Sequence, residues 1–518
     1  MSHLSSLPPL INALLNPVRY PHLTSEIRVV ETHISWLILT GEYAYKIKNP
    51  VNFGFLDFTE LAQRRLFCLE ELRLNQRLTA NLYLEVIAIG GSPEHPELGV
   101  EPAIEYAVKM RQFASGQLLA EQAKAGNLSV LDMDEIVDQL ADFHKHIAIA
   151  DLNSPYGESS NIRYWFDENF SHLFPLLATW PDKAAVQQIA AIEAWGALEW
   201  QRKLALFCER KRSGFVRECH GDLHLGNMTR IDGRVILFDC IEFNPELRWI
   251  DVISDVAFLL IDLLRFGYEA YAHRVLNRYL QLTGDYQSLA VLHYYLVYRA
   301  VVRAKVALLS AQQQQNPQRI QSAHDDYGFY IHLAEHFTRS PQPQLIITHG
   351  FSGSGKSTFA EQLCEATGVI QLRSDVERKR LFGYQASQNT NGEIYSADAS
   401  TQTYQHLAVL AQSVIDAGYS VLVDATFLRC AQRACFRQLA AQLNVPFSIL
   451  HCDAPDEVLC QRIIQRKTEG YDASEATLDV LRLQQQNAES FTTDELPAVI
   501  NANLGVSQVK NRLGLMAC

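Results

Sequence analysis

The chain has 518 residues, which is too long for one hydrophobic core and predicts two or three domains. Its 48% hydrophobic and 20% charged residues are ordinary for a globular protein. The formal net charge of −13 argues against a general nucleic-acid binder, because no global basic field would attract phosphate backbones, and leaves a local basic groove open. The 10 cysteines form no C-x-x-C pair, which excludes a zinc ribbon and predicts reduced thiols.

The sequence gives no sign of export or membrane insertion. No basic segment followed by an apolar run opens the chain, so a signal peptide is not expected. The most apolar helical stretch, residues 291–309, contains Arg299, Arg303 and Lys305 and therefore predicts a packed helix rather than a membrane span. We expect a cytoplasmic protein that does not contact a membrane.

The first part of the chain alternates short strand patterns with one helix. Residues 36–40 and 43–48 flank Gly41-Glu42 and predict a hairpin. A helix is predicted near 61–78 and another strand at 106–110, whereas residues 115–335 are mostly helical in pattern. A strand-rich small lobe followed by a helical lobe predicts an α+β fold of the protein-kinase type.

The last part of the chain alternates strand and helix. Strands are predicted at 345–348, 420–423 and 447–451, with helices at 357–366 and 431–443. This alternation predicts a parallel sheet with crossover helices, and together with the second motif described below it indicates an α/β P-loop NTPase fold.

The prolines of Ser340-Pro341-Gln342-Pro343-Gln344 interrupt the helical pattern before the first of these strands. We therefore place the domains at 1–340 and 341–518.

The first chemical motif runs from His220 to Asn227 as His-Gly-Asp-Leu-His-Leu-Gly-Asn. Phosphoryl transfer needs a group that orients or deprotonates the acceptor hydroxyl, and oxygen ligands for magnesium. Asp222 fits the first role and Asn227 the second. Two apolar runs joined by Asp232-Gly233 predict a hairpin whose open end brings Asn227 and Asp239 together.

This motif resembles that of the aminoglycoside phosphotransferase family, H-G-D-x-x-x-x-N followed by a metal-binding aspartate. The resemblance implies that Asp222 is the catalytic base and that Asn227 and Asp239 bind magnesium. It also implies a structural role for the helix residue Asp255. His220 is expected to be a structural hydrogen-bonding residue rather than a base.

Tyr43-Ala44-Tyr45-Lys46 is similar to the V-A-I-K strand of kinases, in which the lysine contacts nucleotide phosphates. Lys48 shares the strand face with Lys46, and the alignment with Ala44 favours Lys46. A glutamate of the next helix should pair with this lysine, and we choose Glu71 over Glu70. The chain departs from the kinase pattern because residues 32–35 stand where a glycine-rich loop would lie.

The second motif, Gly350 to Ser357, matches G-x-x-x-x-G-K-[S/T] between a predicted strand and a predicted helix. Its backbone N–H groups would wrap the phosphates of ATP or GTP, Lys356 would reach the β and γ groups, and Ser357 would bind Mg²⁺. The predicted nucleotide-binding residues are Gly350, Ser352, Gly353, Ser354, Gly355, Lys356, Ser357 and Thr358.

Asp375 and Arg378 follow the first helix of this segment. They resemble a pair in the small P-loop kinases typified by polynucleotide kinase, gluconate kinase and the zeta-toxin group. The resemblance implies that Asp375 activates the acceptor hydroxyl and that Arg378 holds an acceptor phosphate. Alternatively, Asp375 caps the helix that begins at Val376.

Asp424 ends a buried strand, and is predicted to be a magnesium-site acid or, alternatively, a loop-ordering aspartate. Arg462 and Arg466 lie four residues apart on one helix face and resemble lid arginines that stabilise the transferring phosphate. Alternatively, the two arginines form a basic helix face that is exposed to solvent.

The sequence as a whole resembles bacterial fusions of an aminoglycoside-phosphotransferase-like domain with a P-loop ATP-binding domain. We expect an ATP- and Mg²⁺-dependent phosphotransferase with two kinase sites that act on hydroxyl groups of small-molecule or nucleotide acceptors. One alternative is a nucleotide-gated regulatory ATPase whose kinase-like domain binds an effector. The other is a nucleic-acid 5′-hydroxyl kinase, based on Asp375, Arg378, Lys379 and Arg380.

Overall fold

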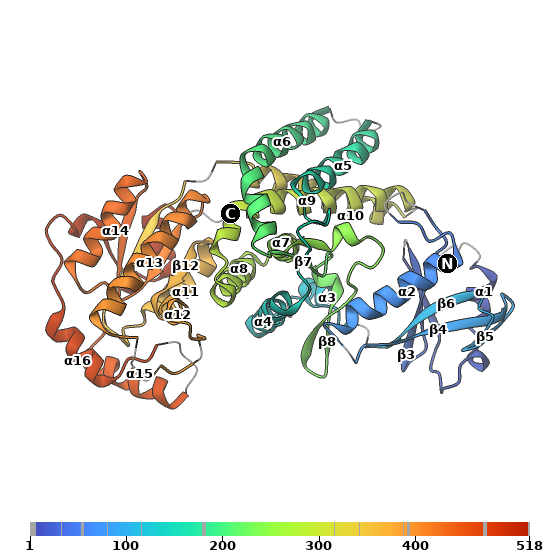
Figure 1. The fold of residues 1–518 in the computed structure, drawn as a ribbon, viewed down its shortest axis with the longest axis horizontal. Coiled ribbons are helices and arrows are strands. Elements are labelled where there is room, and N and C mark those ends of the chain that lie inside the picture. The colour runs from blue at the N-terminus through green and yellow to red at the C-terminus, as the bar shows by residue number, and fades with distance from the viewer. Residues whose placement is uncertain are drawn as a thin grey trace. The chain divides into compact units, whose positions relative to one another are not determined.

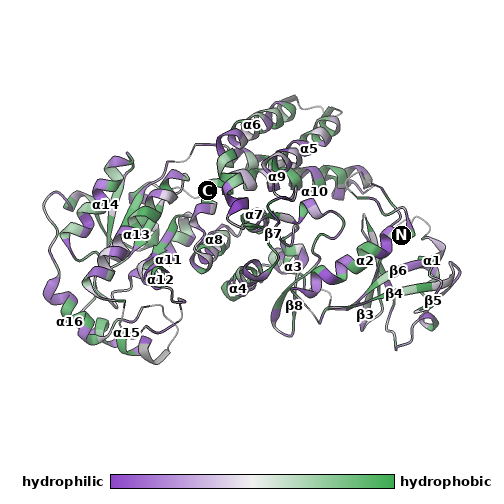
Figure 2. Ribbon diagram, viewed as in Figure 1, coloured by the Kyte–Doolittle hydropathy of each residue, from purple (hydrophilic) through white to green (hydrophobic). Residues whose placement is uncertain are grey.

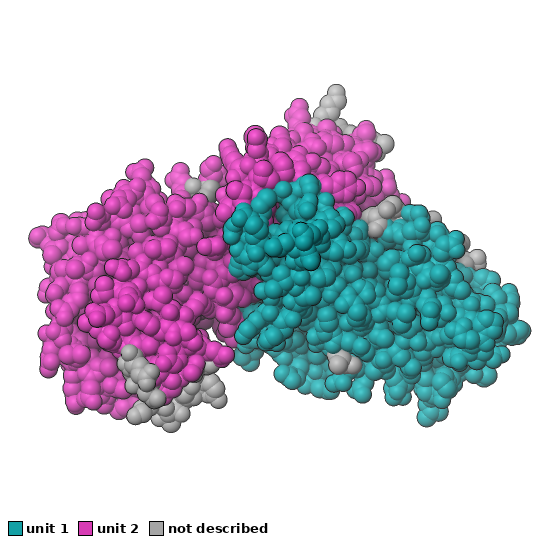
Figure 3. Space-filling model, in the orientation of Figure 1, with its two compact units in different colours: residues 1–162, 208–259 teal, residues 163–207, 260–518 magenta. Residues whose placement is uncertain are grey.

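The computed structural model describes most of the chain. The described residues are 7–32, 34–52, 56–79, 81–114, 116–178, 183–314, 316–340, 342–386, 388–390, 394–469 and 474–515. Pro341 of the predicted linker and His33 of the segment in place of a glycine-rich loop lie outside them. The chain forms two compact units, residues 1–162 with 208–259 and residues 163–207 with 260–518 (Figure 3).

The first unit is built around an antiparallel sheet with the strand order β1-β2-β3-β6-β4-β5. The predicted hairpin is confirmed, since Ile38 of β2 pairs with Tyr45 of β3. Helix α2 packs on this sheet, against β4 and β6 (Figure 1). The strands are β1 Arg28–Glu31, β2 Ser35–Leu39, β3 Tyr43–Lys48, β4 Tyr83–Ser92, β5 His95–Leu98 and β6 Glu105–Arg111, and α2 spans Leu61–Gln76.

Two apolar clusters hold this sheet. One face buries Ile11 and Leu14 of the N-terminal segment beside Ile38 and Ile47. The other buries Cys68 of α2 against sheet residues, and Phe238 joins that cluster from the segment that follows the first motif. The small lobe is therefore packed directly against the strand that leads to Asp239.

The rest of the first unit positions the first motif. Strand β7 precedes the motif and pairs with β10, while β8 and β9 form the hairpin that follows it. Helices α3 and α4 complete the unit. The bounds are α1 Pro9–Ala13, α3 Leu119–Lys124, α4 Val130–His146, β7 Val216–Glu218, β8 Met228–Ile231, β9 Arg234–Leu237 and β10 Trp249–Asp251.

The second unit contains a five-stranded sheet of order β12-β13-β11-β14-β15, and all of its strand pairs are parallel. Its core buries Ile346, Leu422 and Leu450 from three strands against Leu363 of the helix α11. The strands are β11 Leu345–His349, β12 Ile370–Arg373, β13 Val421–Asp424, β14 Phe447–His451 and β15 Val499–Asn501.

The helices of the later part of the chain surround this sheet or belong to the helical lobe. Their bounds are α5 Ser159–Ala178, α6 Lys183–Arg212, α7 Val252–Arg265, α8 Glu269–Thr283, α9 Leu289–Gln313, α10 Pro317–Phe337, α11 Lys356–Thr367, α12 Ser374–Leu381, α13 Ala397–Asp416, α14 Cys430–Gln442, α15 Asp456–Glu469, α16 Leu478–Asn487 and α17 Val506–Leu513. Helices α5, α6 and α7 each have residues in both units.

The predicted fold class is confirmed. A strand-rich small lobe with one long helix is followed by helices, as in kinase-like proteins, and a P-loop segment with a parallel sheet follows. The domain boundary at residue 340 stays a prediction. The division into compact units places α8, α9 and α10 with the P-loop sheet. This division follows which residues pack together and does not test which segment folds independently.

Among the described residues, no helix is long and apolar enough to cross a membrane. Hydrophilic and hydrophobic residues alternate along the helices in Figure 2, as expected where one side of a helix is buried.

A buried arginine ties α14 to the segment that follows α16. The Arg433 side chain is 0% exposed. Its Nε and Nη2 atoms donate to the two carboxylate oxygens of Glu495, at 2.8 and 3.0 Å. Its Nη1 atom donates to the carbonyl oxygen of Phe427 at 3.1 Å. These hydrogen bonds of a buried guanidinium hold the segment after α16 against α14, so this segment is part of the P-loop fold.

We predict that Glu495→Ala destabilises the protein by about 3–5 kcal/mol, because it leaves the Arg433 guanidinium buried without its counter-ion. Urea unfolding followed by circular dichroism measures the effect. Asp479→Ala is the control, since Asp479 pairs with Arg482 where both side chains are exposed, and should cost less than about 1 kcal/mol. Equal destabilisation by the two substitutions would contradict the assignment.

Candidate active sites

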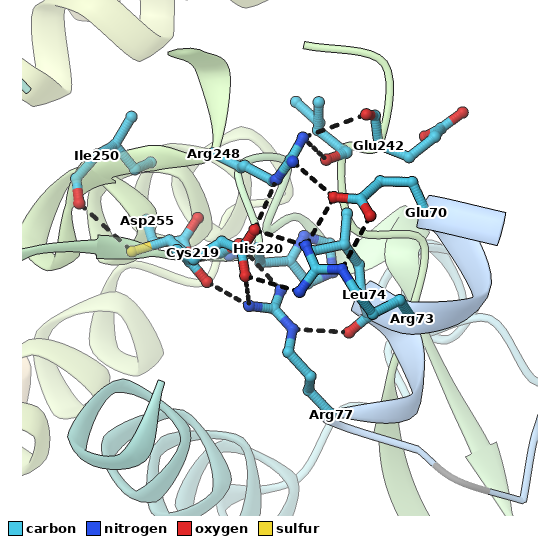
Figure 4. A network of polar contacts seen from close by, with 12 residues as sticks. Glu70, Arg73, Leu74, Arg77, Cys219, His220, Glu242, Arg248, Ile250 and Asp255 are labelled. Atoms are coloured by element: carbon cyan, nitrogen blue, oxygen red, sulfur yellow. Dashed lines mark hydrogen bonds and ion pairs between the residues drawn. The ribbon is translucent and has the colours of Figure 1, made fainter. Parts of the chain in front are cut away.

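A network of arginines and carboxylates joins α2 to the strand that leads into the first motif (Figure 4). Arg73 of α2 and Arg77, the residue that caps the C-terminus of this helix, contact the Glu218 carboxylate of β7 at 2.6 and 3.1 Å. Arg248 contacts the same carboxylate at 3.2 Å and Glu70 at 2.7 Å. Glu70 is therefore engaged by arginines, and α2 is held beside the chain segment that enters the motif at His220.

Lys46 lies between two carboxylates. Its Nζ atom is 2.8 Å from Oε1 of Glu71 and 2.5 Å from Oδ1 of Asp239. Burial alone would raise the pKa of Glu71, but the ammonium groups of Lys46 and Lys48 lower it to about 2. Burial disfavours the charged form of Lys46, yet Asp239 and Glu71 raise its pKa well above the usual value. The predicted lysine and glutamate thus form an ion pair beside the predicted metal ligand.

The second lysine of the strand is also paired, which sequence reasoning did not predict. Lys48 lies 2.7 Å from Oε2 of Glu71 and forms an ion pair with Glu242. Burial raises the pKa of Glu242 above its ordinary value, although Lys48 opposes the shift. The only sequence signal for Glu242 is its position three residues after Asp239.

The backbone at the start of the first motif is held by Asp255, whose side chain is fully buried. Its two carboxylate oxygens accept the backbone N–H groups of His220 and Gly221, at 2.8 and 2.9 Å. The His220 ring bonds to the carbonyl oxygen of Phe238 at 2.8 Å, and burial lowers its pKa. Asp255 and His220 therefore have the structural contacts that the sequence led us to expect.

Asp222 and Asn227 lie together at the end of this loop. The Nδ2 atom of Asn227 donates to the Oδ2 atom of Asp222 at 3.0 Å and to its backbone carbonyl at 2.9 Å. The His224 ring lies 3.4 Å from the same carboxylate. About a third of the Asp222 side chain is exposed, so it can meet an acceptor from solvent.

The hairpin of β8 and β9 brings the predicted metal ligands to one end, as expected. Asp232 and Gly233 have left-handed φ angles of 51° and 79°, which the tight turn requires. At the open end, Phe238 N–H donates to the Asn227 carbonyl at 3.0 Å, so Asp239 lies next along the chain. An amide and a partly exposed carboxylate here suit the oxygen preference of Mg²⁺. The metal-binding role of the pair stays a prediction.

The second motif has the expected P-loop context between β11 and α11. The loop packs closely, since a Cβ atom on Gly350 would lie 2.1 Å from the Cys452 carbonyl oxygen, and Gly353 and Gly355 have φ angles of 84° and 90°. The Lys356 Nζ atom donates to the Phe351 carbonyl at 2.7 Å. Burial lowers the pKa of Lys356, and the nearby Asp424 opposes the shift.

Asp424 ends β13, and its role as a magnesium-site acid stays a prediction. Burial raises its pKa, while Arg373, Lys356 and a hydrogen bond from Ser357 act in the opposite direction. A hydroxyl beside a carboxylate at the start of α11 fits a magnesium ion bound together with phosphates. Asp424 also accepts the Gln371 side-chain amide at 3.2 Å, a contact that orders the carboxylate.

A cavity of about 760 Å³ opens over the P-loop. The predicted residues Ser357 and Thr358 line it together with Arg462 and Arg466 of α15. Arg462 also donates to the Gly353 carbonyl at 3.1 Å. The remaining predicted residues along it are Gly353, Ser354 and Gly355. The structure therefore brings the lid arginines and the P-loop to one cavity.

The two predicted acceptor residues are not among the residues that line this cavity. Helix α12 begins at Ser374, so Asp375 lies in its first turn rather than at its N-cap. Arg378 is buried, and its Nη1 atom donates to the Ile394 carbonyl at 3.0 Å, with Tyr395 beneath the guanidinium at 4.9 Å. Arg378 thus has structural partners, and the acceptor-binding role of both residues stays a prediction.

Sequence reasoning missed several residues at this cavity. Arg373 ends β12, and Arg274, Asn277, Arg278 and Gln281 come from α8. None of the α8 residues belongs to a motif of the P-loop segment, because α8 precedes the P-loop by about 70 residues. Their only sequence signal is the spacing of Arg274, Arg278 and Gln281 along one helix face.

We predict that Asp255→Asn destabilises the protein by about 2–4 kcal/mol, because an amide cannot accept both backbone N–H groups and leaves one unsatisfied. Urea unfolding followed by tryptophan fluorescence checks this. Asp232→Asn, the same change at the exposed hairpin turn, should have an effect within about 0.5 kcal/mol. If Asp255→Asn is as mild as this control, the carboxylate does not hold the loop.

Comparison with known proteins finds similarities to separate parts of the chain. The AAA domain family model AAA_33 matches residues 345–491, which confirms the P-loop segment. A sugar kinase from Janibacter sp. is 22% identical over 33% of this chain and 92% of that one, with a TM-score of 0.26. An aminoglycoside 2′-phosphotransferase-IIIa mutant in complex with GDP is 16% identical over 62% and 97%, with a TM-score of 0.38.

One relative matches along nearly the whole length. The Uncharacterized protein Rv2004c of Mycobacterium tuberculosis is 31% identical over 454 residues, which is 86% of this chain and 88% of that protein. The aligned region is long enough to include both motifs and both parts of the fold. The chain belongs to the same protein family as this mycobacterial protein.

Proposed function

We propose that the protein is an ATP- and Mg²⁺-dependent phosphotransferase with two separate sites, each transferring the γ-phosphate of ATP to a hydroxyl group. The observation that carries the proposal is the position of Lys46 between Glu71 and Asp239. A nucleotide-binding lysine needs such a pairing to stay charged and oriented when it is buried. The P-loop with its lid arginines supplies the second site.

At the first site, Asp222 takes the role of the base that orients the acceptor hydroxyl. Its carboxylate is partly exposed, and Asn227 and His224 hold it in place. Asn227 and Asp239 would hold Mg²⁺, which supplies positive charge to the transferring phosphate. Lys46 adds a fixed ammonium group on the same side.

At the second site, the loop of Gly350–Ser357 wraps the phosphates with backbone N–H groups. Ser357 and Asp424 would hold Mg²⁺, and Arg462 and Arg466 stabilise the charge of the phosphate in transfer. Asp375 is the group proposed to activate the second acceptor.

The contacts of the basic residues next to Asp375 disfavour the nucleic-acid end kinase. Lys379 is buried, and its Nζ atom contacts the Ala386 carbonyl at 3.0 Å and Glu475 at 3.2 Å. Arg380 is paired with Glu377 and the Gln281 carbonyl. Small-molecule hydroxyl acceptors are therefore the preferred class for this site.

We predict that Asp222→Asn and Lys356→Ala remove two separable activities. Each should lower transfer of label from [γ-³²P]ATP at its own site by about 10²-fold or more, because each removes a group that acts on the transferring phosphate or its acceptor. A screen of metabolites and aminoglycosides with the full chain measures both transfers.

Two substitutions of the same type serve as controls. Asp232→Asn changes an exposed turn, and Lys510→Ala removes a lysine that donates to the Ala366 carbonyl at 3.2 Å. Both should leave transfer nearly unchanged. Full transfer by Asp222→Asn would refute the first site. ATP hydrolysis without transfer to any acceptor would favour the nucleotide-gated regulatory protein instead.

A further inference from the structure

Helix α8 is docked on the P-loop sheet of the second unit through Asn277. Its side-chain oxygen accepts the Gln371 N–H at 2.7 Å, and its amide donates to the Val369 carbonyl at 3.1 Å. Strand β12 is the edge of the parallel sheet, and an edge leaves backbone groups unpaired. Asn277 fills these hydrogen-bonding positions as a neighbouring strand would. These two hydrogen bonds therefore set which residue of α8 lies beside which residues of β12.

Two further residues of α8, Arg274 and His273, set the position of this helix along α11. Arg274 forms ion pairs with Glu361 and Glu365 at 2.7 and 2.5 Å. The His273 ring bonds to the Glu365 carbonyl at 2.8 Å. Together with Asn277, these contacts hold α8 against both the edge strand and the helix that begins at the P-loop.

From this position α8 reaches the proposed magnesium acid. The Gln281 side chain donates to the side-chain oxygen of Gln371 at 3.3 Å. Gln371 in turn donates to Oδ2 of Asp424 at 3.2 Å, and both residues are less than 5% exposed. A chain of three side chains therefore connects α8 to the carboxylate beside Ser357.

The cavity over the P-loop is strongly cationic. Arg274 and Arg278 line it from α8, and Glu361 and Glu365 are its acidic lining residues. Both glutamates are already paired with Arg274. Among the described residues, five arginines (Arg274, Arg278, Arg373, Arg462 and Arg466) and two glutamates line the cavity. Such a concentration of guanidinium groups suits the phosphates of a nucleotide.

We propose that α8 forms one side of the P-loop nucleotide site and that Arg278 binds phosphate groups of the bound nucleotide. The proposal rests on the proposed function, in which this P-loop binds ATP. Arg278 lies one helical turn after Arg274, and it lines the same cavity as Ser357 and Thr358. The docking contacts hold in place the helix that carries Arg278, which lowers the entropy cost of positioning it for a phosphate.

Isothermal titration calorimetry of the full chain with Mg·ATP and with adenosine tests the proposal. Arg278→Ala should raise the Kd of the P-loop site, identified as the Mg·ATP binding step that Lys356→Ala weakens, by about 10- to 100-fold, because charge-assisted hydrogen bonds to phosphate are lost. Binding of Mg·ATP at the first site should stay unchanged. The Kd for adenosine, which lacks phosphates, should stay unchanged. Arg278→Lys should recover part of the affinity. Arg482→Ala removes an exposed arginine that does not line the cavity and is the matched control.

Three outcomes would overturn the assignment of Arg278. Mg·ATP affinity could stay unchanged in Arg278→Ala, or Arg482→Ala could lower it equally. A parallel loss of adenosine binding would indicate a purely structural residue. Lys356→Ala separates this proposal from the proposed function: if it leaves Mg·ATP binding at the P-loop intact, the nucleotide site itself is wrongly assigned.

Discussion

The buried carboxylate of Glu71 is the constraint on which the first site depends. A charge with 0% exposure is strongly destabilising unless it is paired, and Glu71 receives the ammonium groups of Lys46 and Lys48 on its two oxygens. Each lysine then has a second carboxylate partner, Asp239 for Lys46 and Glu242 for Lys48. The small-lobe strand, helix α2 and the segment after the hairpin are therefore held together by one set of charges.

This arrangement explains why the surrounding arginines matter. The network of Arg73, Arg77 and Arg248 on Glu218 holds α2 beside β7, and β7 leads into the loop that carries Asp222. The loop itself is held from the other side by Asp255. The loop that carries Asp222 is thus positioned by buried hydrogen bonds on rigid elements, which is the condition that precise phosphoryl transfer requires.

The P-loop is positioned in a different way. In a P-loop the phosphate-binding groups are backbone N–H groups, so their placement depends on backbone torsion angles and close packing rather than on paired side chains. Gly350 approaches the Cys452 carbonyl and Gly353 approaches the Leu459 carbonyl so closely that a Cβ atom would lie 2.1 and 2.8 Å away. The glycines therefore serve the fold of the loop as well as the approach of a ligand.

Local sequence was enough to predict the elements whose signals are local. The hairpin at Asp232-Gly233 follows from two residues that tolerate positive φ, and the P-loop follows from glycines between a strand and a helix. Pairing over long sequence distances was harder. The ion pair of Lys46 with Glu71 was expected only by resemblance, and the partner of Lys48, Glu242, is 194 residues away and was not expected.

The sequence by itself determined the two motifs, their order and the two fold classes, because glycine conformations, hydrophobic periodicity and motif spacing act over short stretches of chain. The tertiary structure alone decided which charges are buried together and which helix borders the P-loop. Arg378 matched a motif and is nevertheless enclosed by its own structural partners. Arg278 matched none and lines the cavity over the P-loop. The physical reason is that desolvation and charge pairing depend on all neighbours in space, and those neighbours come from distant parts of the chain.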